Sequence, residues 1–311
     1  MRKSSNRDAF EIDTLHPLFP LFPLFPLSPC PLLKKPPIYM KNRTAIGLIP
    51  AAGKATRISP LPLSKELFPV GFQGDVNDIK KNNQANQAQL RPKVVSHYLL
   101  EKMQLAGIDK AYFILRGGKW DIPAYFGDGE MLAMSLGYLI MGLPYGVPFT
   151  LDSAYPFVKD VVVALGFPDI LFEPQDAFIQ ILKRLESNNA DVVLGLFPTD
   201  KPQKAGMVDF DDTGKVRSII EKPPQSDLRF MWGIAVWKPK FTEFLHEYLV
   251  AVKEDINLPN LPEIPIGNVI QAAISKGLQV EAEAFADGSY LDIGTPDDLV
   301  KAVKGFGGDF E

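Results

Sequence analysis

The chain has 311 residues, enough for one large domain or two small ones; 46% of them are apolar and 23% are charged, as is typical of soluble globular proteins. Its net charge of −4 gives no electrostatic basis for binding nucleic acid or an anionic membrane. A single cysteine, Cys30, excludes an internal disulfide framework, and three scattered histidines give no zinc pattern, so the cytoplasm is the expected compartment.

Proline recurs every third residue near the N-terminus, from Pro17 to Pro29. This period matches polyproline II and forbids a helix, which excludes a transmembrane span and an ordinary signal-peptide core. We interpret the segment as a disordered tail; the alternatives are a ligand for a proline-binding module and an apolar anchor. Because Met40 begins a stretch that looks like a natural start, we expect residues 1–39 to be dispensable and residues 40–311 to form the domain.

Alternating strand and helix patterns begin at Thr44 and continue to the end of the chain. Strands are predicted at 45–49, 111–115, 161–165, 191–197 and 234–237, with a hairpin at 207–210 and 216–220. Helices are predicted at 94–106, 176–188, 241–252, 266–276 and 296–303. This order favours a doubly wound α/β fold with a mixed, mostly parallel sheet, helices on both faces and a small β-rich excursion in the second half.

The segment Gln73–Leu90 is rich in Asn and Gln and has few apolar residues. It is predicted to be a surface loop inserted into the domain at 73–90. Because it closely follows the segment around Lys65, a lid over a ligand site is the alternative interpretation.

The first predicted strand ends in a turn of small residues, Pro50-Ala51-Ala52-Gly53-Lys54-Ala55-Thr56-Arg57. Such a turn exposes backbone N–H groups at one edge of a sheet, and with Arg57 and Lys65 nearby these donors form a site for a polyanion such as a nucleoside triphosphate. The turn is not a Walker P-loop, because Ala55 follows Lys54, and it is not the dinucleotide G-x-G-x-x-G motif.

This turn and five later motifs occur in an order that resembles the sugar-phosphate nucleotidylyltransferases, over about residues 44–305. The opening motif runs through Pro60 and continues with Ser64-Lys65 and Phe68-Pro69. The later motifs are Arg91-Pro92-Lys93, Leu165–Asp169, Gly206–Val208, Glu221–Pro223 and Leu291–Pro296. The resemblance implies a Rossmann-like nucleotide-diphospho-sugar transferase fold. It also implies a Mg²⁺-dependent reaction in which a nucleoside triphosphate and a sugar 1-phosphate give an NDP-sugar and pyrophosphate.

The resemblance implies chemical roles for three cationic side chains and two carboxylates. Arg57 and Lys65 would bind the phosphates of the nucleotide, and Lys222 would bind the sugar phosphate. Asp169 and Asp292 would hold Mg²⁺, which prefers one or two carboxylates together with phosphate oxygens. Catalysis would consist of positioning and charge neutralisation and needs no nucleophilic side chain. The alternative is that the lysines are solvated surface residues and that the aspartates belong to caps and turns.

The substrate-binding residues implied by the resemblance lie in several parts of the chain. Glu221 would bind sugar hydroxyls, and the small residues would let the backbone approach a ligand. The full set is Ala52, Gly53, Thr56, Gly146, Gly206, Glu221 and Gly233.

Three departures from the family pattern leave alternatives open. Ala55 replaces a glycine of the turn, Met141 stands where pyrimidine-reading members typically have Gln, and Phe167-Pro168 precedes Asp169 in place of the usual pair. The alternatives are an inactive homologue that binds a nucleotide and regulates a partner, and a transferase for a non-sugar phosphate acceptor. The sequence leaves the base, the sugar and the oligomeric state undecided, and it is compatible with a homo-oligomer.

Overall fold

The computed structural model of the chain describes residues 45–74, 90–142, 145–255 and 263–306. Parallel strands form the centre of its main sheet. β1 (Ala45–Pro50) lies between β4 (Lys110–Arg116) and β6 (Val162–Leu165), and β5 (Ser135–Met141) pairs with the far edge of β4. β1 is buried from its first residue to Ile49, which explains its continuous apolar run and confirms the predicted central parallel strand.

The second half of the sheet is added by antiparallel pairing. β11 (Phe230–Trp237) pairs with β6 and with β8 (Val192–Pro198), and β12 (Val280–Ala284) runs parallel to β8. The predicted hairpin is confirmed as β9 (Gly206–Phe210) and β10 (Val216–Glu221), and it is attached to β11 through β9. The strand predicted at 234–237 begins earlier, at Phe230.

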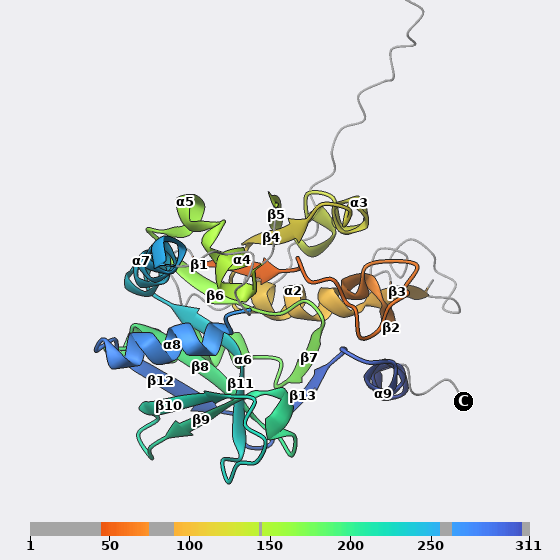
Figure 1. Cartoon of the computed structure of the whole chain (residues 1–311). Helices are drawn as coiled ribbons and strands as arrows, with labels where there is room; N and C mark the ends of the chain where they lie inside the picture. Colours follow the sequence, from red (N-terminus) through yellow and green to blue (C-terminus); the bar gives the residue numbers. More distant parts are fainter. Residues whose placement is uncertain (1–44, 75–89, 143–144, 256–262, 307–311) are drawn as a thin grey trace, which may run out of the picture. The chain divides into compact units, whose positions relative to one another are not determined.

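Helices cover both faces of the sheet, as predicted (Figure 1). Alternate residues of β1 point to opposite faces, so Ala45 and Ile49 pack on one side and Ile46 and Leu48 on the other. One side carries α2 (Val95–Leu105) and α6 (Ala177–Ser187), and the other carries α4 (Val147–Asp152), α5 (Tyr155–Val158), α7 (Pro239–Asp255) and α8 (Ile266–Ser275). The remaining helical segments are η1 (Lys65–Leu67), α3 (Asp121–Phe126), η2 (Glu130–Leu132), η3 (Pro202–Lys204) and α9 (Pro296–Phe306).

Among the described residues, two short strand pairs lie outside the main sheet, and the sequence did not predict them. β2 (Pro69–Gly74) pairs with β3 (Leu90–Val94) in an antiparallel hairpin. The ends of the predicted 73–90 loop are therefore strand residues, and its remainder, 75–89, lies outside the described residues. β7 (Ile170–Glu173) pairs with β13 (Ser289–Asp292), which places Asp292 opposite Ile170.

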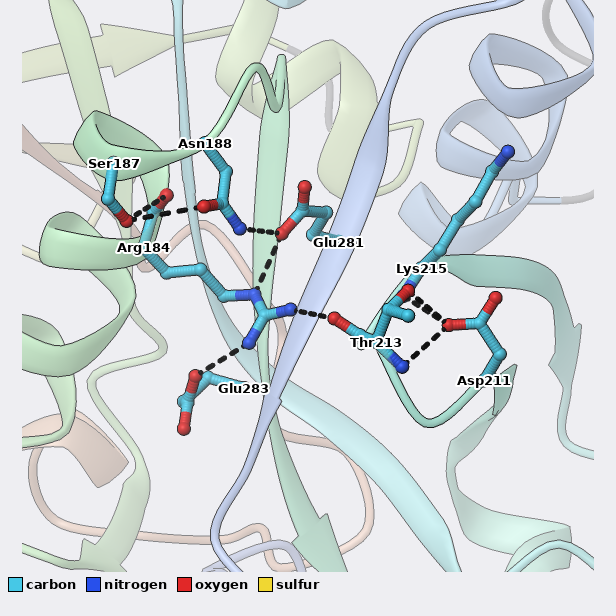
Figure 2. A network of polar contacts seen from close by, with 8 residues as sticks. All are labelled: Arg184, Ser187, Asn188, Asp211, Thr213, Lys215, Glu281 and Glu283. Carbon is cyan, nitrogen blue, oxygen red and sulfur yellow. Dashed lines mark hydrogen bonds and ion pairs between the residues drawn. The ribbon is translucent and has the colours of Figure 1, made fainter.

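Arg184 on α6 links β12 to the turn of the β9–β10 hairpin (Figure 2). Its Nε lies 2.9 Å from Glu281 Oε2 and its Nη1 lies 3.1 Å from Glu283 Oε2. Its Nη2 donates to the backbone oxygen of Thr213. One planar guanidinium thus holds a helix, a strand and a hairpin together.

No helix in the described ranges is long and apolar enough to cross a membrane. The prediction that residues 1–39 form a tail lies outside the described residues.

Candidate active site

The turn after β1 presents an open backbone edge. Ala51 and Ala52 are buried, and the Ala51 N–H donates to Ile114 O at 2.8 Å, which fixes the end of β1 beside β4. Gly53 is exposed, and a Cβ added to it would meet no atom within 4 Å. A ligand can therefore approach the backbone here, as expected for a phosphate-binding turn.

Ala55, the residue that replaces the family's glycine, has a φ of 53°. This is the left-handed region that favours glycine, because a Cβ clashes with the following carbonyl oxygen. The backbone thus keeps a glycine-like conformation although the side chain is a methyl group. The next two residues, Thr56 and Arg57, are exposed.

Lys65 forms an ion pair with Asp169, and only 14% of each side chain is exposed. Burial alone would lower the pKa of Lys65, but attraction and hydrogen bonding to Asp169 outweigh burial, so its pKa is raised. Lys65 is therefore a permanent cation at neutral pH. Asp169 directly precedes β7, next to the carboxyl end of the central strand β6. Ligands of open α/β sheets bind at this edge.

Asp292, the last residue of β13, lies in the same cluster. The Ile293 N–H donates to Asp169 O at 2.9 Å, which ties the two aspartate segments together. Removal from water and the neighbouring Asp169 raise the pKa of Asp292 to about 6, although Lys65 and Arg57 oppose the shift. Arg57 Nη2 lies 3.8 Å from Asp292 Oδ2, and these two side chains remain 62% and 44% exposed.

Both Asp169 and Asp292 fit a Mg²⁺ ion. The neighbouring Asp169 carboxylate raises the proton affinity of Asp292, and a divalent cation would relieve this repulsion. Within the described ranges no group of three or more His, Cys, Asp or Glu residues could hold a metal by itself. Mg²⁺ commonly completes its coordination with substrate phosphates and water, so two protein carboxylates suffice.

Two pockets flank this cluster. Lys65 lines one of about 410 Å³, together with Gly53, Lys54, Ala55 and the segment after β4. Arg57 and Asp292 line another of about 570 Å³, whose wall also contains the cations Lys201, Lys204 and Arg229.

A second cluster forms around Glu221. Glu221 lies opposite Gly206 in the β9–β10 ladder and accepts hydrogen bonds from the Trp232 side chain and the Gly267 backbone. Burial raises its pKa, although Lys222 and these hydrogen bonds oppose the shift. Lys222 is exposed and has a φ of 48°, so its side chain leaves the end of β10 at an unusual angle. A Cβ on Gly206 would lie 2.6 Å from Trp232 Nε1, so this position requires glycine.

Two further glycines have packing roles. A Cβ on Gly233 would lie 2.5 Å from Tyr290 Cε2. Gly146 has a φ of 101°, and a Cβ there would lie 2.9 Å from the backbone oxygen of Ile264. These contacts explain both glycines without a ligand, and their substrate-binding role stays a prediction.

The structure therefore brings Arg57, Lys65, Asp169 and Asp292 into one cluster and Gly206, Glu221 and Lys222 into another. No hydrogen bond or ion pair joins the side chains of the two clusters in the part of the chain that the structure describes. Met141, expected near the base, is the last residue of β5 and pairs with Arg116.

Sequence reasoning missed a set of polar residues around Lys65. Asp121 and Lys119, which follow β4, contact Ser64 and Glu66 on either side of Lys65. The only signal was that two polar residues, two positions apart, occur in both segments, and such a pattern specifies no pairing without a fold.

A family model described as nucleotidyl transferase matches residues 46–306. The chain belongs to the nucleotidyl transferase family. The match spans all the motifs named above, and the resemblance seen in the sequence is confirmed.

Members of the nucleotidyl transferase family with similar sequences come from several organisms. The low-salt glycan biosynthesis nucleotidyltransferase Agl11 of Haloferax volcanii is 26% identical over 213 residues, which are 68% of this chain and 56% of that protein. The chain thus spans little more than half of that relative. A glucose-1-phosphate thymidylyltransferase of Neisseria meningitidis is 24% identical over 263 residues, which are 83% of this chain and 81% of the relative.

Solved structures support the same fold. A Bacillus anthracis protein provisionally named a glucose-1-phosphate thymidylyltransferase superposes with a TM-score of 0.67 at 19% identity, covering 83% of this chain and 94% of that one. A UDP-glucose pyrophosphorylase of Acinetobacter baumanii superposes with a TM-score of 0.65 at 20% identity, covering 85% and 93%. At these identities the likeness concerns the fold, and it confirms the predicted Rossmann-like class.

Proposed function

We propose that this chain transfers a nucleotidyl group from a nucleoside triphosphate to a sugar 1-phosphate, forming an NDP-sugar and pyrophosphate. The observation that carries the proposal is the cluster of Arg57, Lys65, Asp169 and Asp292 beside the open turn of a nucleotidyl transferase. Relatives named glucose-1-phosphate thymidylyltransferase favour a sugar phosphate as the acceptor.

The reaction joins two anions, and the residues of the cluster offset their repulsion. An oxygen of the sugar phosphate attacks the α-phosphorus, the bond from that phosphorus to the bridging oxygen breaks, and pyrophosphate leaves. Lys65 and Arg57 bind the phosphates as negative charge grows on the leaving group, and the backbone edge at Gly53 cradles the same phosphates. The strand ends position these groups before the substrates arrive, so little reorganisation is needed.

Mg²⁺ would be held by Asp169 and Asp292, and it supplies further positive charge to the phosphates when it is bound. Lys65 contacts the Asp169 carboxylate in the free protein. The same carboxylate would therefore bind the Lys65 ammonium in the free protein and Mg²⁺ in the complex. Lys65 would then contact the phosphates when the Asp169 carboxylate helps to hold Mg²⁺.

The second cluster would hold the acceptor. Glu221 offers a partly buried carboxylate to sugar hydroxyls, Gly206 lets the backbone approach the sugar, and Lys222 supplies a cation for the sugar phosphate. Trp232 and the Gly267 backbone fix the orientation of the Glu221 carboxylate.

The proposal is tested by measuring pyrophosphate release with Mg²⁺ for each nucleoside triphosphate against a panel of sugar 1-phosphates. We expect release that requires both substrates and falls by at least about a hundredfold in Asp169→Asn. Lys240→Met is a matched control, because it removes a lysine paired with an aspartate, Asp191, at 2.8 Å outside both clusters. Normal rates in Asp169→Asn would refute the assignment of the site.

A non-catalytic nucleotide-binding role is the second candidate, and the methyl group of Ala55 in a left-handed turn favours it. This role predicts nucleotide binding without pyrophosphate release from any pair of substrates. Calorimetric titration with each nucleotide, done beside the release assay, separates the two functions.

A further inference from the structure

Lys65 lies on η1, a helix of three residues that has little stability of its own. Its closing backbone hydrogen bonds are Leu67 N–H to Ser64 O at 2.8 Å and Phe68 N–H to Lys65 O at 3.1 Å. A single 3₁₀ turn fixes several dihedral angles for few hydrogen bonds. The position of η1 must therefore be set by contacts with other elements.

The residue before Lys65 is held by the first residue of α3. Asp121 Oδ2 accepts from the Ser64 N–H at 2.6 Å, and Asp121 Oδ1 accepts from the Ser64 hydroxyl at 2.8 Å. Both carboxylate oxygens thus bind one residue, and hydrogen bonds to a charged acceptor are stronger than neutral ones.

The residue after Lys65 is held from the loop between β4 and α3, two positions before Asp121. Lys119 Nζ lies 2.6 Å from Glu66 Oε1, and the two side chains are only 5% and 2% exposed. The backbone oxygen of Glu66 also accepts from the Ser96 hydroxyl at 2.7 Å. A buried ion pair contributes little net stability, because desolvation offsets the attraction, and apolar residues of similar volume stabilise a fold equally well. The Lys119–Glu66 pair is therefore better explained by fixing the position of the backbone next to Lys65 than by adding stability.

We propose that Lys119 and Asp121 are positioning residues for Lys65. They bind the residues on either side of it, so the backbone of η1 stays fixed while the Lys65 side chain changes partner. This inference rests on the proposed function, in which Asp169, the ion-pair partner of Lys65, also binds a metal. When the Asp169 carboxylate no longer contacts Lys65, the contacts of Asp121 with Ser64 and of Lys119 with Glu66 keep the Lys65 ammonium beside the phosphates. Both residues line the 410 Å³ pocket together with Lys65, as this role requires.

The test uses two variants that remove the two contacts separately. Asp121→Asn weakens the two hydrogen bonds that Asp121 accepts from Ser64. The double variant Glu66→Met/Lys119→Met removes the ion pair without leaving a buried, unpaired charge, so it is expected to fold. We expect kcat to fall by about 10- to 100-fold in each, with the KM for the sugar 1-phosphate changed less than about threefold. In a Lys65→Ala background, the same changes should lower kcat by less than about twofold, because they act through Lys65.

Lys102→Met is the matched control. Lys102 is also a buried lysine, 2% exposed, and lies 3.2 Å from a single carboxylate, that of Glu173. Its loss should leave kcat within about twofold of the wild type. Equal losses of kcat in the presence and in the absence of the Lys65 side chain would overturn the proposal, because they would show a general effect on the structure.

A second readout needs no turnover and separates this inference from the proposed function. The acetylation rate of the Lys65 amine, followed by mass spectrometry in the full chain, should rise at least about fivefold in Asp121→Asn, because η1 would open more often. Lys65 acetylation in Lys102→Met should match the wild type. If the wild type releases no pyrophosphate, the proposed function fails, but the acetylation rates still decide the positioning role. An unchanged rate of Lys65 acetylation in both Asp121→Asn and Glu66→Met/Lys119→Met would refute the positioning role.

Discussion

At the scale of single residues, Ala55 carries a conformational cost in the phosphate-binding turn. At a φ of 53° its methyl group costs about 1 kcal/mol relative to glycine, which outweighs the extra chain entropy that glycine loses on folding. We expect Ala55→Gly to raise the free energy of unfolding by about 0.5 kcal/mol and to leave turnover unchanged or higher. Urea denaturation measures the first effect and pyrophosphate release the second. Ala106→Gly is the control, because Ala106 has an ordinary φ of −81° and should lose stability instead. A less stable Ala55→Gly would show that the turn is not strained.

Local chemistry made several single residues predictable. The turn at Gly53 and the cations Arg57 and Lys65 follow from a strand that ends in small residues, and the open space at Gly53 agrees with this reading. Long-range partners had no such signal. Lys65 and Asp169 are separated by 104 positions, and nothing in either segment specifies the other. Asp121 remained unassigned for the same reason, since its contact with Ser64 exists only after β4 has paired with β1.

At the scale of elements, Arg184 joins three parts of the second half of the chain (Figure 2). Gly214, in the hairpin turn, has a φ of 86°, and a Cβ there would lie 2.1 Å from Arg184 Nη2, so turn and guanidinium are fitted to each other. We expect Arg184→Met to lower the free energy of unfolding by about 2 to 3 kcal/mol, because Glu281 and Glu283 lose their cationic partner while they remain partly buried. Arg184→Lys should recover less than half, since the single Nζ of lysine cannot reach three acceptors that Arg184 contacts from three separate nitrogens. Urea denaturation of both, with the exposed neighbour Lys183→Met as control, checks this. A change below about 0.5 kcal/mol would show that the network is dispensable.

Elements were predictable where their signal is periodic and local. The helical face in 94–106 predicted α2, and the apolar run at 45–49 predicted β1, with bounds that agree with the structure to within one residue. β7 and β13 were missed because each is four residues long and because Phe172 and Tyr290 in them look like any core residues. Their pairing brings Asp169 and Asp292 together, so the part of the fold that builds the proposed Mg²⁺ site is the part with the weakest sequence signal.

At the scale of the whole molecule, ligand binding and folding are linked. The candidate site draws on η1, on the end of β6 and on β13, so a ligand that bridges them binds the folded chain and not the unfolded one. The raised pKa of Asp292 shows that its charge is poorly compensated in the free protein. Since the folded state binds this proton more tightly than the unfolded state, its contribution to stability falls as the pH rises from about 4 to 6. A bound Mg²⁺–nucleotide complex should restore that stability at neutral pH.

We therefore expect Mg²⁺ with the preferred nucleoside triphosphate, at about a hundred times its Kd, to stabilise the chain by about 2.7 kcal/mol and to raise its Tm by roughly 5 to 10 °C. Scanning calorimetry at pH 7.5 measures the shift, and chelation of Mg²⁺ with EDTA should reduce it by more than half. Asp169→Asn should lose the Mg²⁺-dependent part of the shift, whereas Lys240→Met should keep it, because its ion pair lies outside the cluster. An equal shift with and without Mg²⁺ would show that the nucleotide binds without using the two carboxylates.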